Sequence, residues 1–270
     1  MKIFDVHIHI YPEKIALKAS RSIGDFYGGT DIHGTGTLED CITRMDAAGI
    51  ERFAAHSVAL LPRNVEAINR FILSAQARYP ERIVPFAAVH PDQENVTAAV
   101  ESVARQGFRG FKIHPDMQRF EVDSPRALTM LEAIADSGLP ILIHCGDFRY
   151  DYDTPQRILS LRKKLPRLKM ICAHLGGWSQ WNEAAEMLSD CGITVDLSSS
   201  LFQIEPDRAV EILRGFGVKN VLYGTDYPMW DPVEELRRFM KLRLTDDERR
   251  DIFWNNANQF FKLEQNETRG

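Results

Sequence analysis

The sequence is poor in cysteine and lacks any long apolar run. Its four cysteines have no CxxC or other zinc-knuckle spacing, which argues against a cysteine zinc site or a disulfide framework and predicts buried, reduced thiols. No apolar run approaches the roughly 20 residues of a membrane helix. The first residues also lack the apolar stretch of a signal peptide. We therefore expect a cytoplasmic protein without a membrane partner.

Excess positive charge is absent as well. The chain has 33 Lys and Arg against 38 Asp and Glu, a formal net charge of −5. It has no basic stripe of the kind that binds nucleic acid and no Lys/Arg block that would bind an anionic surface. A small-molecule substrate is the expected partner. The length of 270 residues and the 44% hydrophobic content suffice for one large core.

Short β-rich runs alternate with helical patterns along the whole chain, with no linker between them. A helix is predicted after Thr37, because Thr37 suits an N-cap and apolar residues then recur at helical spacing up to Met45. Other helices are predicted at Asn64–Arg78, Glu94–Gln106, Pro125–Ser137, Pro155–Leu165, Ser179–Ser189, Pro206–Phe216, Pro232–Met240 and Asp246–Phe260. Strands are predicted at Ile3–His9, Arg52–Val58, Ile83–His90, Phe108–His114, Pro140–Cys145, Lys169–His174, Ile193–Ser198 and Asn220–Asp226.

Eight strand and helix units of this size predict a fold of the α/β class, a (β/α)₈ TIM barrel that forms a single domain over residues 1–270. A doubly wound open sheet is the alternative. That fold usually has a GxGxxG turn after its first strand, whereas the first strand here ends in histidines.

Histidines cluster at the predicted strand ends. Seven of the eight lie there, namely His7, His9, His56, His90, His114, His144 and His174. The carboxyl ends of barrel strands form the rim that holds the active site, so these distant residues are expected to converge. A lone histidine near a strand end is usually structural, and we interpret His56 and His90 in that way.

A metal site is predicted from the pair His7 and His9. Alternate residues of a strand share a face, so both imidazoles can bind one ion. His144 and Asp226, at the ends of two other strands, are the best placed to complete an open site with three nitrogen ligands and one oxygen ligand. One divalent ion is expected, with zinc first and manganese, iron or cobalt as alternatives, and no second metal. His174 is predicted to act as a base near metal-bound water.

These residues lie in six segments that together resemble the amidohydrolase superfamily, and most closely the amidohydrolase-related family that includes the aminocarboxymuconate semialdehyde decarboxylase group. The segments span the chain in the expected order: Asp5-Val6-His7-Ile8-His9, Gly110-Phe111-Lys112-Ile113-His114-Pro115, Ile143-His144-Cys145-Gly146, His174-Leu175-Gly176-Gly177, Gly224-Thr225-Asp226-Tyr227-Pro228 and Asn255-Asn256-Ala257.

The resemblance implies that His7, His9, His144 and Asp226 bind one divalent ion. It also implies that His174 orients or deprotonates the metal-bound water or polarises the substrate. Asp226 is the second predicted catalytic group, because its carboxylate can take a proton from metal-bound water at neutral pH. A homodimer is a further expectation from the family.

Four residues are predicted to contact substrate. Lys112 and His114 share one face of the fourth strand; a carboxylated Lys112 that bridges two metals is the alternative role for this lysine. Arg149 suits a substrate carboxylate, although a surface salt bridge explains it equally well. Trp178 suits the wall of a pocket or packing beneath a loop.

Hydrolysis of an amide, ester or lactone of a small carboxylate-bearing molecule is the leading hypothesis for the reaction. The alternative is non-oxidative decarboxylation, since decarboxylases of the family use the ion to hold a substrate carboxylate or hydroxyl. In those members we expect an acidic residue after the His-Gly turn, and the stretch Gly176–Trp181 contains none, which favours hydrolysis. A non-catalytic metal-binding barrel is the second alternative.

Overall fold

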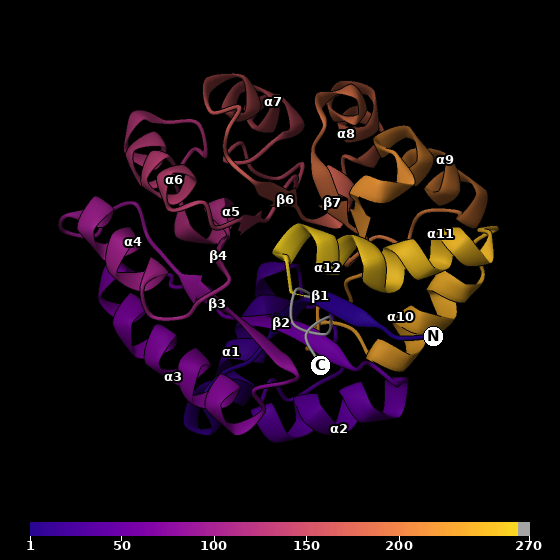
Figure 1. The fold of residues 1–270 in the computed structure, drawn as a ribbon, viewed down its shortest axis with the longest axis horizontal. Helices are drawn as coiled ribbons and strands as arrows, with labels where there is room; N and C mark the ends of the chain where they lie inside the picture. Colours follow the sequence, from indigo (N-terminus) through magenta and orange to yellow (C-terminus); the bar gives the residue numbers. More distant parts are fainter. Residues whose placement is uncertain (264–270) are drawn as a thin grey trace, which may run out of the picture.

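The computed structural model describes residues 1–263, in which eight parallel strands follow one another in sequence order. Helices surround the strands (Figure 1). The predicted (β/α)₈ barrel is therefore confirmed, and each predicted strand contains the observed one. The strands are β1 (Phe4–His9), β2 (Arg52–His56), β3 (Ile83–Ala88), β4 (Gly110–Ile113), β5 (Ile141–Ile143), β6 (Met170–Cys172), β7 (Thr194–Asp196) and β8 (Val221–Leu222).

The barrel closes between its last and first strands. Strand β8 is short, but the chain beyond it continues beside β1. Asp226 N donates to His7 O at 2.9 Å, and His9 N donates to Tyr227 O at 2.7 Å. These backbone bonds bring Asp226 next to the two histidines of β1.

An irregularity in β1 separates the interior core from the site. The register between β1 and β2 shifts between Asp5 and Ile8, as at a β-bulge. Val6 belongs to the apolar cluster inside the barrel, whereas His7 and His9 line a cavity. Strict alternation would place Val6 and His7 on opposite faces of the strand. The bulge therefore accounts for both side chains pointing inward, Val6 into the core and His7 into the cavity.

A helical run covers the end of the barrel at which the strands begin (Figure 1). It consists of α11 (Asp246–Arg250), a π-helical turn (Asp251–Asn255) and α12 (Asn256–Phe261), where one helix was predicted. Trp254 and Phe261 pack on Phe4, with ring centroids 6.3 and 5.6 Å away. The opposite rim, where the strands end, is left for the functional site.

The predicted crossover helices are present. Thr37 caps the first of them, because its side chain accepts a hydrogen bond from Asp40 N. Among the described residues, no helix is long and apolar enough to cross a membrane. The crossover helices are α2 (Leu38–Ala48), α3 (Val65–Arg78), α4 (Val96–Ala104), α6 (Pro125–Ser137), α7 (Pro155–Lys164), α8 (Trp181–Leu188), α9 (Pro206–Phe216) and α10 (Pro232–Met240).

Two helices were not predicted, α1 (Glu13–Phe26) and the short α5 (Pro115–Gln118). The buried positions of α1 are Ala16, Ser20 and Gly24, four residues apart. These small residues leave no apolar period in the sequence, and no side chain caps the helix at Pro12. Helix α1 matters for function because it lines the cavity at the open rim.

The capping box of α11 provides a test of stability against pH. Thr245 and Glu248 bond each other's backbone N–H groups. The hydrogen bond from Arg214, and then the one from Thr245, lower the pKa of Glu248 to about 2. An unfolded glutamate has a pKa of about 4.3, so this contribution to stability is present above that pH and is lost as the pH falls toward 2.

We expect Glu248→Gln to flatten the loss of unfolding free energy between about pH 4.3 and pH 2. The difference should stay below about 1 kcal/mol, because the ion pair lies near the surface. Urea unfolding at a series of pH values measures it. A variant that loses stability as steeply as the parent protein would contradict this assignment.

Candidate metal centre and active site

His7 and His9, at the end of β1, face Asp226. Their Nε2 atoms lie 3.3 Å apart, and each lies 3.4 Å from Asp226 Oδ1. The side chains of His7, His9 and Asp226 are only 1%, 9% and 13% exposed. Three of the four predicted metal ligands therefore meet at one point.

The spacing of these donor atoms fits a metal ion. Two ligands bonded at about 2.0–2.1 Å to a tetrahedral ion lie about 3.4 Å apart, and the three edges here measure 3.3, 3.4 and 3.4 Å. Two imidazoles and a carboxylate suit zinc, manganese or iron. The described residues therefore include a cluster fit for one divalent ion.

The other ring nitrogen of His7, Nδ1, has two hydrogen-bond partners. Its Nδ1 lies 2.9 Å from Asp196 Oδ2 and 2.9 Å from Ser198 Oγ. A proton donated from Nδ1 to this carboxylate leaves a lone pair on Nε2, the atom that a metal would bind. Sequence reasoning missed both partners, although Asp196 ends the seventh strand much as Asp226 follows the eighth.

The protonation states at this cluster suit metal binding. Burial lowers the pKa of His7 to about 4, and the charge of Lys112 adds to this effect. Burial also lowers the pKa of His9. Burial alone would raise the pKa of Asp226, but His7 and a hydrogen bond from His9 bring it well below its usual value. At neutral pH the cluster has two neutral imidazoles and one carboxylate, as ligation requires.

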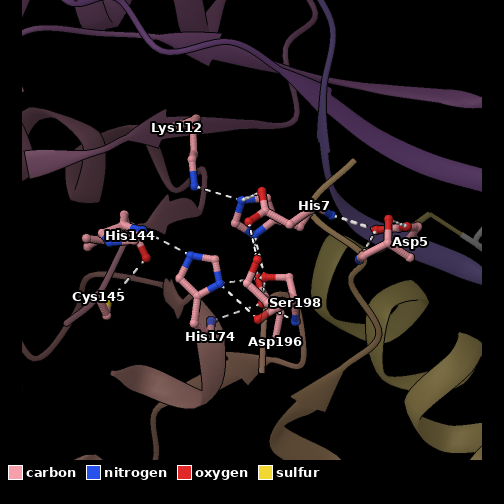
Figure 2. Close-up of polar contacts among 12 residues, drawn as sticks. Asp5, His7, Lys112, His144, Cys145, His174, Asp196 and Ser198 are labelled. Atoms are coloured by element: carbon pink, nitrogen blue, oxygen red, sulfur yellow. Dashed lines mark hydrogen bonds and ion pairs between the residues drawn. The ribbon is translucent and has the colours of Figure 1, made fainter. Parts of the chain in front are cut away.

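Lys112 of β4 points toward His7 of the cluster, as Figure 2 shows. Its Nζ is 3.1 Å from His7 Nε2, and the residue is 1% exposed. Burial lowers the pKa of Lys112 to about 8, with Asp226 opposing the change. A cation thus lies at the closed end of the cavity, where sequence analysis predicted a substrate contact.

His144 lies apart from the other predicted ligands. Its Nδ1 is 3.0 Å from His174 Nε2 (Figure 2), and its Nε2 faces Asp116 Oδ2 at 3.6 Å without a hydrogen-bond partner. His174 in turn donates from Nδ1 to the carbonyl of Ser198 at 2.9 Å. In this arrangement His174 stands between His144 and His7.

His114, the other predicted contact on β4, belongs to a second buried group with His144, Asp116 and Asp153. The rings of His114 and His144 stack at 3.7 Å and 11°. Because nitrogen lone pairs lie in the ring plane, two nearly parallel rings do not converge on one ion. Burial raises the pKa of Asp116 to about 8. We therefore interpret His114, His144, Asp116 and Asp153 as a buried polar group beside the metal cluster and not as a second metal site.

Arg149 lies in a loop contact and lines neither cavity near the cluster. Its guanidinium bonds the carboxylate of Asp147, and its Nη1 donates to Phe26 O at 2.7 Å. It also lies over the rings of Tyr27 and Trp178, 5.4 and 5.9 Å from their centroids. Arg149 therefore ties the loop after β5 to the end of α1.

Two cavities meet at the cluster. The larger has a volume of about 590 Å³ and includes Lys112, His114 and His144 in its lining. The smaller, about 150 Å³, is lined partly by Trp178. Tyr27, His174, Asp226 and Met229 border both. Tyr27, which the sequence did not indicate, also lies 3.0 Å from His114 Nε2 through its hydroxyl.

Several site residues have left-handed backbone conformations. The φ angles are 59° at His174, 52° at Leu175, 46° at Ser199 and 63° at Asp226. Such angles in residues other than glycine cost about 1–3 kcal/mol each. The surrounding packing holds them in place, and it thereby sets the direction of the side chains of His174 and Asp226.

Ser199 and Trp230 orient Asp226. Ser199 Oγ donates to Asp226 Oδ2 at 2.6 Å and accepts from Trp230 Nε1 at 2.8 Å. We expect Ser199→Ala to weaken metal binding about 10- to 100-fold, because Oδ1 is no longer aimed at the histidines. Competition with a chelator measures this. Ser200→Ala is the matched control, since the Ser200 hydroxyl donates to the Ser198 carbonyl and, among the described residues, makes no hydrogen bond to Asp226; equal losses in both variants would contradict the role.

A (β/α)₈ barrel with imidazoles and a carboxylate gathered at the carboxyl ends of its strands defines the class of metal-dependent barrel enzymes. The sequence matches the amidohydrolase family over residues 4–263. The chain therefore belongs to the amidohydrolase family, and the resemblance seen in the sequence is confirmed. A comparison with curated proteins finds no match.

Several solved structures share the fold. A 5-carboxyvanillate decarboxylase from Novosphingobium aromaticivorans, complexed with manganese and 4-hydroxy-3-methoxy-5-nitrobenzoic acid, is 18% identical with a TM-score of 0.76, covering 97% of this chain and 96% of its own. A 2,6-dihydroxybenzoate decarboxylase from Rhizobium is 18% identical with a TM-score of 0.73, covering 97% and 99%. An uncharacterised TIM-barrel protein from Bordetella bronchiseptica is 19% identical with a TM-score of 0.78, covering 97% and 99%.

Proposed function

We propose that this enzyme is a metal-dependent decarboxylase that acts on an aromatic or unsaturated carboxylic acid. The observation on which this rests is the buried Lys112 ammonium 3.1 Å from His7, because a cation beside a metal site provides a second positive partner for a carboxylate. The decarboxylases among the similar structures support the same choice. Hydrolysis, the first hypothesis from the sequence, has the family membership as its support.

The ion would be held by His7, His9 and Asp226. His144 remains the predicted fourth ligand, although its ring now contacts His174. Manganese becomes a stronger candidate than zinc, because structures of the similar decarboxylases contain it. A divalent ion bound there would supply positive charge that orients the carboxylate and its neighbouring hydroxyl or carbonyl.

The side chains around the ion then bind the carboxylate, exclude water and supply a proton. Lys112 binds one carboxylate oxygen, and the apolar cavity wall excludes water from the reacting carbon. The bond between that carbon and the carboxylate breaks, CO₂ leaves, and the electron pair stays on carbon. His174 provides the proton that replaces the carboxylate and regains a proton from solvent after the product leaves, while His144 Nδ1, 3.0 Å from His174 Nε2, holds the ring in place. Asp226, with its low pKa, acts mainly as a ligand.

Labelled water separates the two reactions. Metal-loaded enzyme incubated in D₂O with a panel of hydroxyaryl and unsaturated acids should release CO₂ and place one deuterium on the carbon that held the carboxylate. A parallel panel of lactones, amides and esters in H₂¹⁸O should show no enzymatic incorporation of oxygen. Oxygen-18 in a product, without CO₂ release from any acid, would contradict the decarboxylase proposal and favour hydrolysis.

Other predictions from the sequence stay predictions. They are a cytoplasmic location, a homodimer, and the absence of nucleic-acid and membrane partners. The role of Trp178 as a substrate contact also remains a proposal; it lines the smaller cavity.

A further inference from the structure

The larger cavity is too big for a single aromatic ring. Its volume is about 590 Å³, whereas a cavity of about 150 Å³ holds benzene. Sites for ligands of drug size measure about 300–1,000 Å³. His7, His9 and Asp226 form only a small part of its lining, so much of the cavity lies beyond the reacting group.

The walls beyond the cluster are largely apolar and come from two parts of the chain. Helix α1 contributes Ile15, Ala19 and Ile23, and the segment from the end of β2 into α3 contributes Val58, Leu60, Ala67 and Ile68. A surface of this kind binds hydrocarbon groups.

Two large apolar side chains at the mouth of the cavity are exposed. Ile15 is 48% exposed and Leu60 is 44% exposed, and both line the cavity. A ligand that extends from the cluster to the mouth would remove this surface from water. Exposed apolar surface next to a catalytic cavity commonly marks a binding surface.

Two cations stand at the same mouth. Lys18 and Arg63 line the cavity, and within the described part of the chain neither forms an ion pair. Their charges attract an anionic ligand toward an otherwise acidic protein. The carboxylate can then settle at Lys112, at the closed end.

We propose that the substrate is an aryl or unsaturated carboxylic acid with an extended apolar substituent remote from the carboxylate, at least the size of a second ring or a six-carbon chain. The carboxylate lies at the metal cluster, and the substituent lies along α1 and reaches Ile15 and Leu60. The position of the carboxylate rests on the proposed function; the position of the apolar group rests on the cavity alone.

Binding of unreactive acids tests this without turnover. Calorimetry with the manganese-loaded enzyme would compare benzoate with 4-alkylbenzoates from methyl to hexyl. Each buried methylene should strengthen binding about fourfold until the chain reaches the mouth. Equal affinities for all members of the series, or affinities that fall for substituents longer than methyl, would overturn the proposal. CO₂ release is not measured here, so failure of the decarboxylase assay leaves this result unaffected.

Two exposed residues of α1 provide a matched pair of variants. Ile15 lines the cavity, whereas Leu17 is 55% exposed on the same helix and does not. Ile15→Asn, which adds no charge, should weaken binding of 4-hexylbenzoate at least about tenfold while leaving benzoate unchanged, and Leu17→Asn should change neither. Circular dichroism checks that both variants fold. Equal effects of the two substitutions, or unchanged hexylbenzoate binding in Ile15→Asn, would overturn the proposal.

Discussion

We expect Asp226→Asn to lower kcat/KM at least about 10³-fold and to remove most of the bound metal. The amide has no negative charge to balance the ion, and its nitrogen would face the two histidines as a donor. Steady-state kinetics on an acid that the enzyme decarboxylates, with metal content measured on the same samples, reports both effects.

The matched control for that variant is Asp231→Asn. Asp231 lies five residues further along, caps α10 and pairs with Arg44, so its loss should affect stability and leave kcat/KM near that of the parent. An Asp226→Asn enzyme with full metal content and unchanged kcat/KM would remove Asp226 from the site.

Asp196→Ala should be the most destabilising substitution near the metal. The buried carboxylate of Asp196 accepts bonds from His7 Nδ1, from the backbone N–H groups of His174 and Ser198, and from the Ser198 hydroxyl. Its removal leaves these donors without an acceptor, which should cost about 3–5 kcal/mol of unfolding free energy. Metal affinity should also fall about 10- to 100-fold, because the orientation of His7 is lost.

Asp196→Asn separates the two effects. The amide oxygen still accepts from backbone N–H groups, so part of the stability should return, whereas His7 loses its charged partner and the metal affinity stays low. Urea unfolding of metal-free protein and chelator competition measure the two quantities. Unchanged metal affinity in both variants would show that Asp196 has no role in orienting His7.

The barrel and the location of the site could be predicted from the sequence because both follow from local patterns. Strand and helix periods alternate eight times, and parallel strands bring their carboxyl ends to one rim. His7, His9 and Asp226 therefore had to lie near one another. Their mutual distances of 3.3–3.4 Å agree with that reasoning.

Long-range packing accounts for what the sequence left out. Helix α1 buries Ala16, Ser20 and Gly24, which carry no apolar signal, and Tyr27 follows directly from it. The orientation of a ring cannot be read from strand alternation, so the contact between His144 and His174 was not foreseen. Arg149 had two equally good interpretations, and only the observed loop packing places it against Asp147.

The choice of reaction was the weakest step. The missing acidic residue after the His-Gly turn pointed to hydrolysis, whereas several of the similar solved structures are decarboxylases. A metal cluster of this composition serves either chemistry, so the ligands alone do not select between them. Our choice rests instead on a neighbouring group, Lys112 on β4.

The left-handed backbone at Leu175 and Ser199 has a consequence for laboratory evolution. Glycine adopts such angles without steric strain, so a library screened for heat tolerance alone should enrich glycine at Ser199, whereas at Leu175 the loss of a fully buried side chain outweighs the relief of strain. Glycine at 199 would also delete the hydroxyl that orients Asp226, and glycine at 175 would loosen the turn that presents His174. Screens for thermostability therefore need an activity filter, because the easiest gains lie where turnover depends on rigidity.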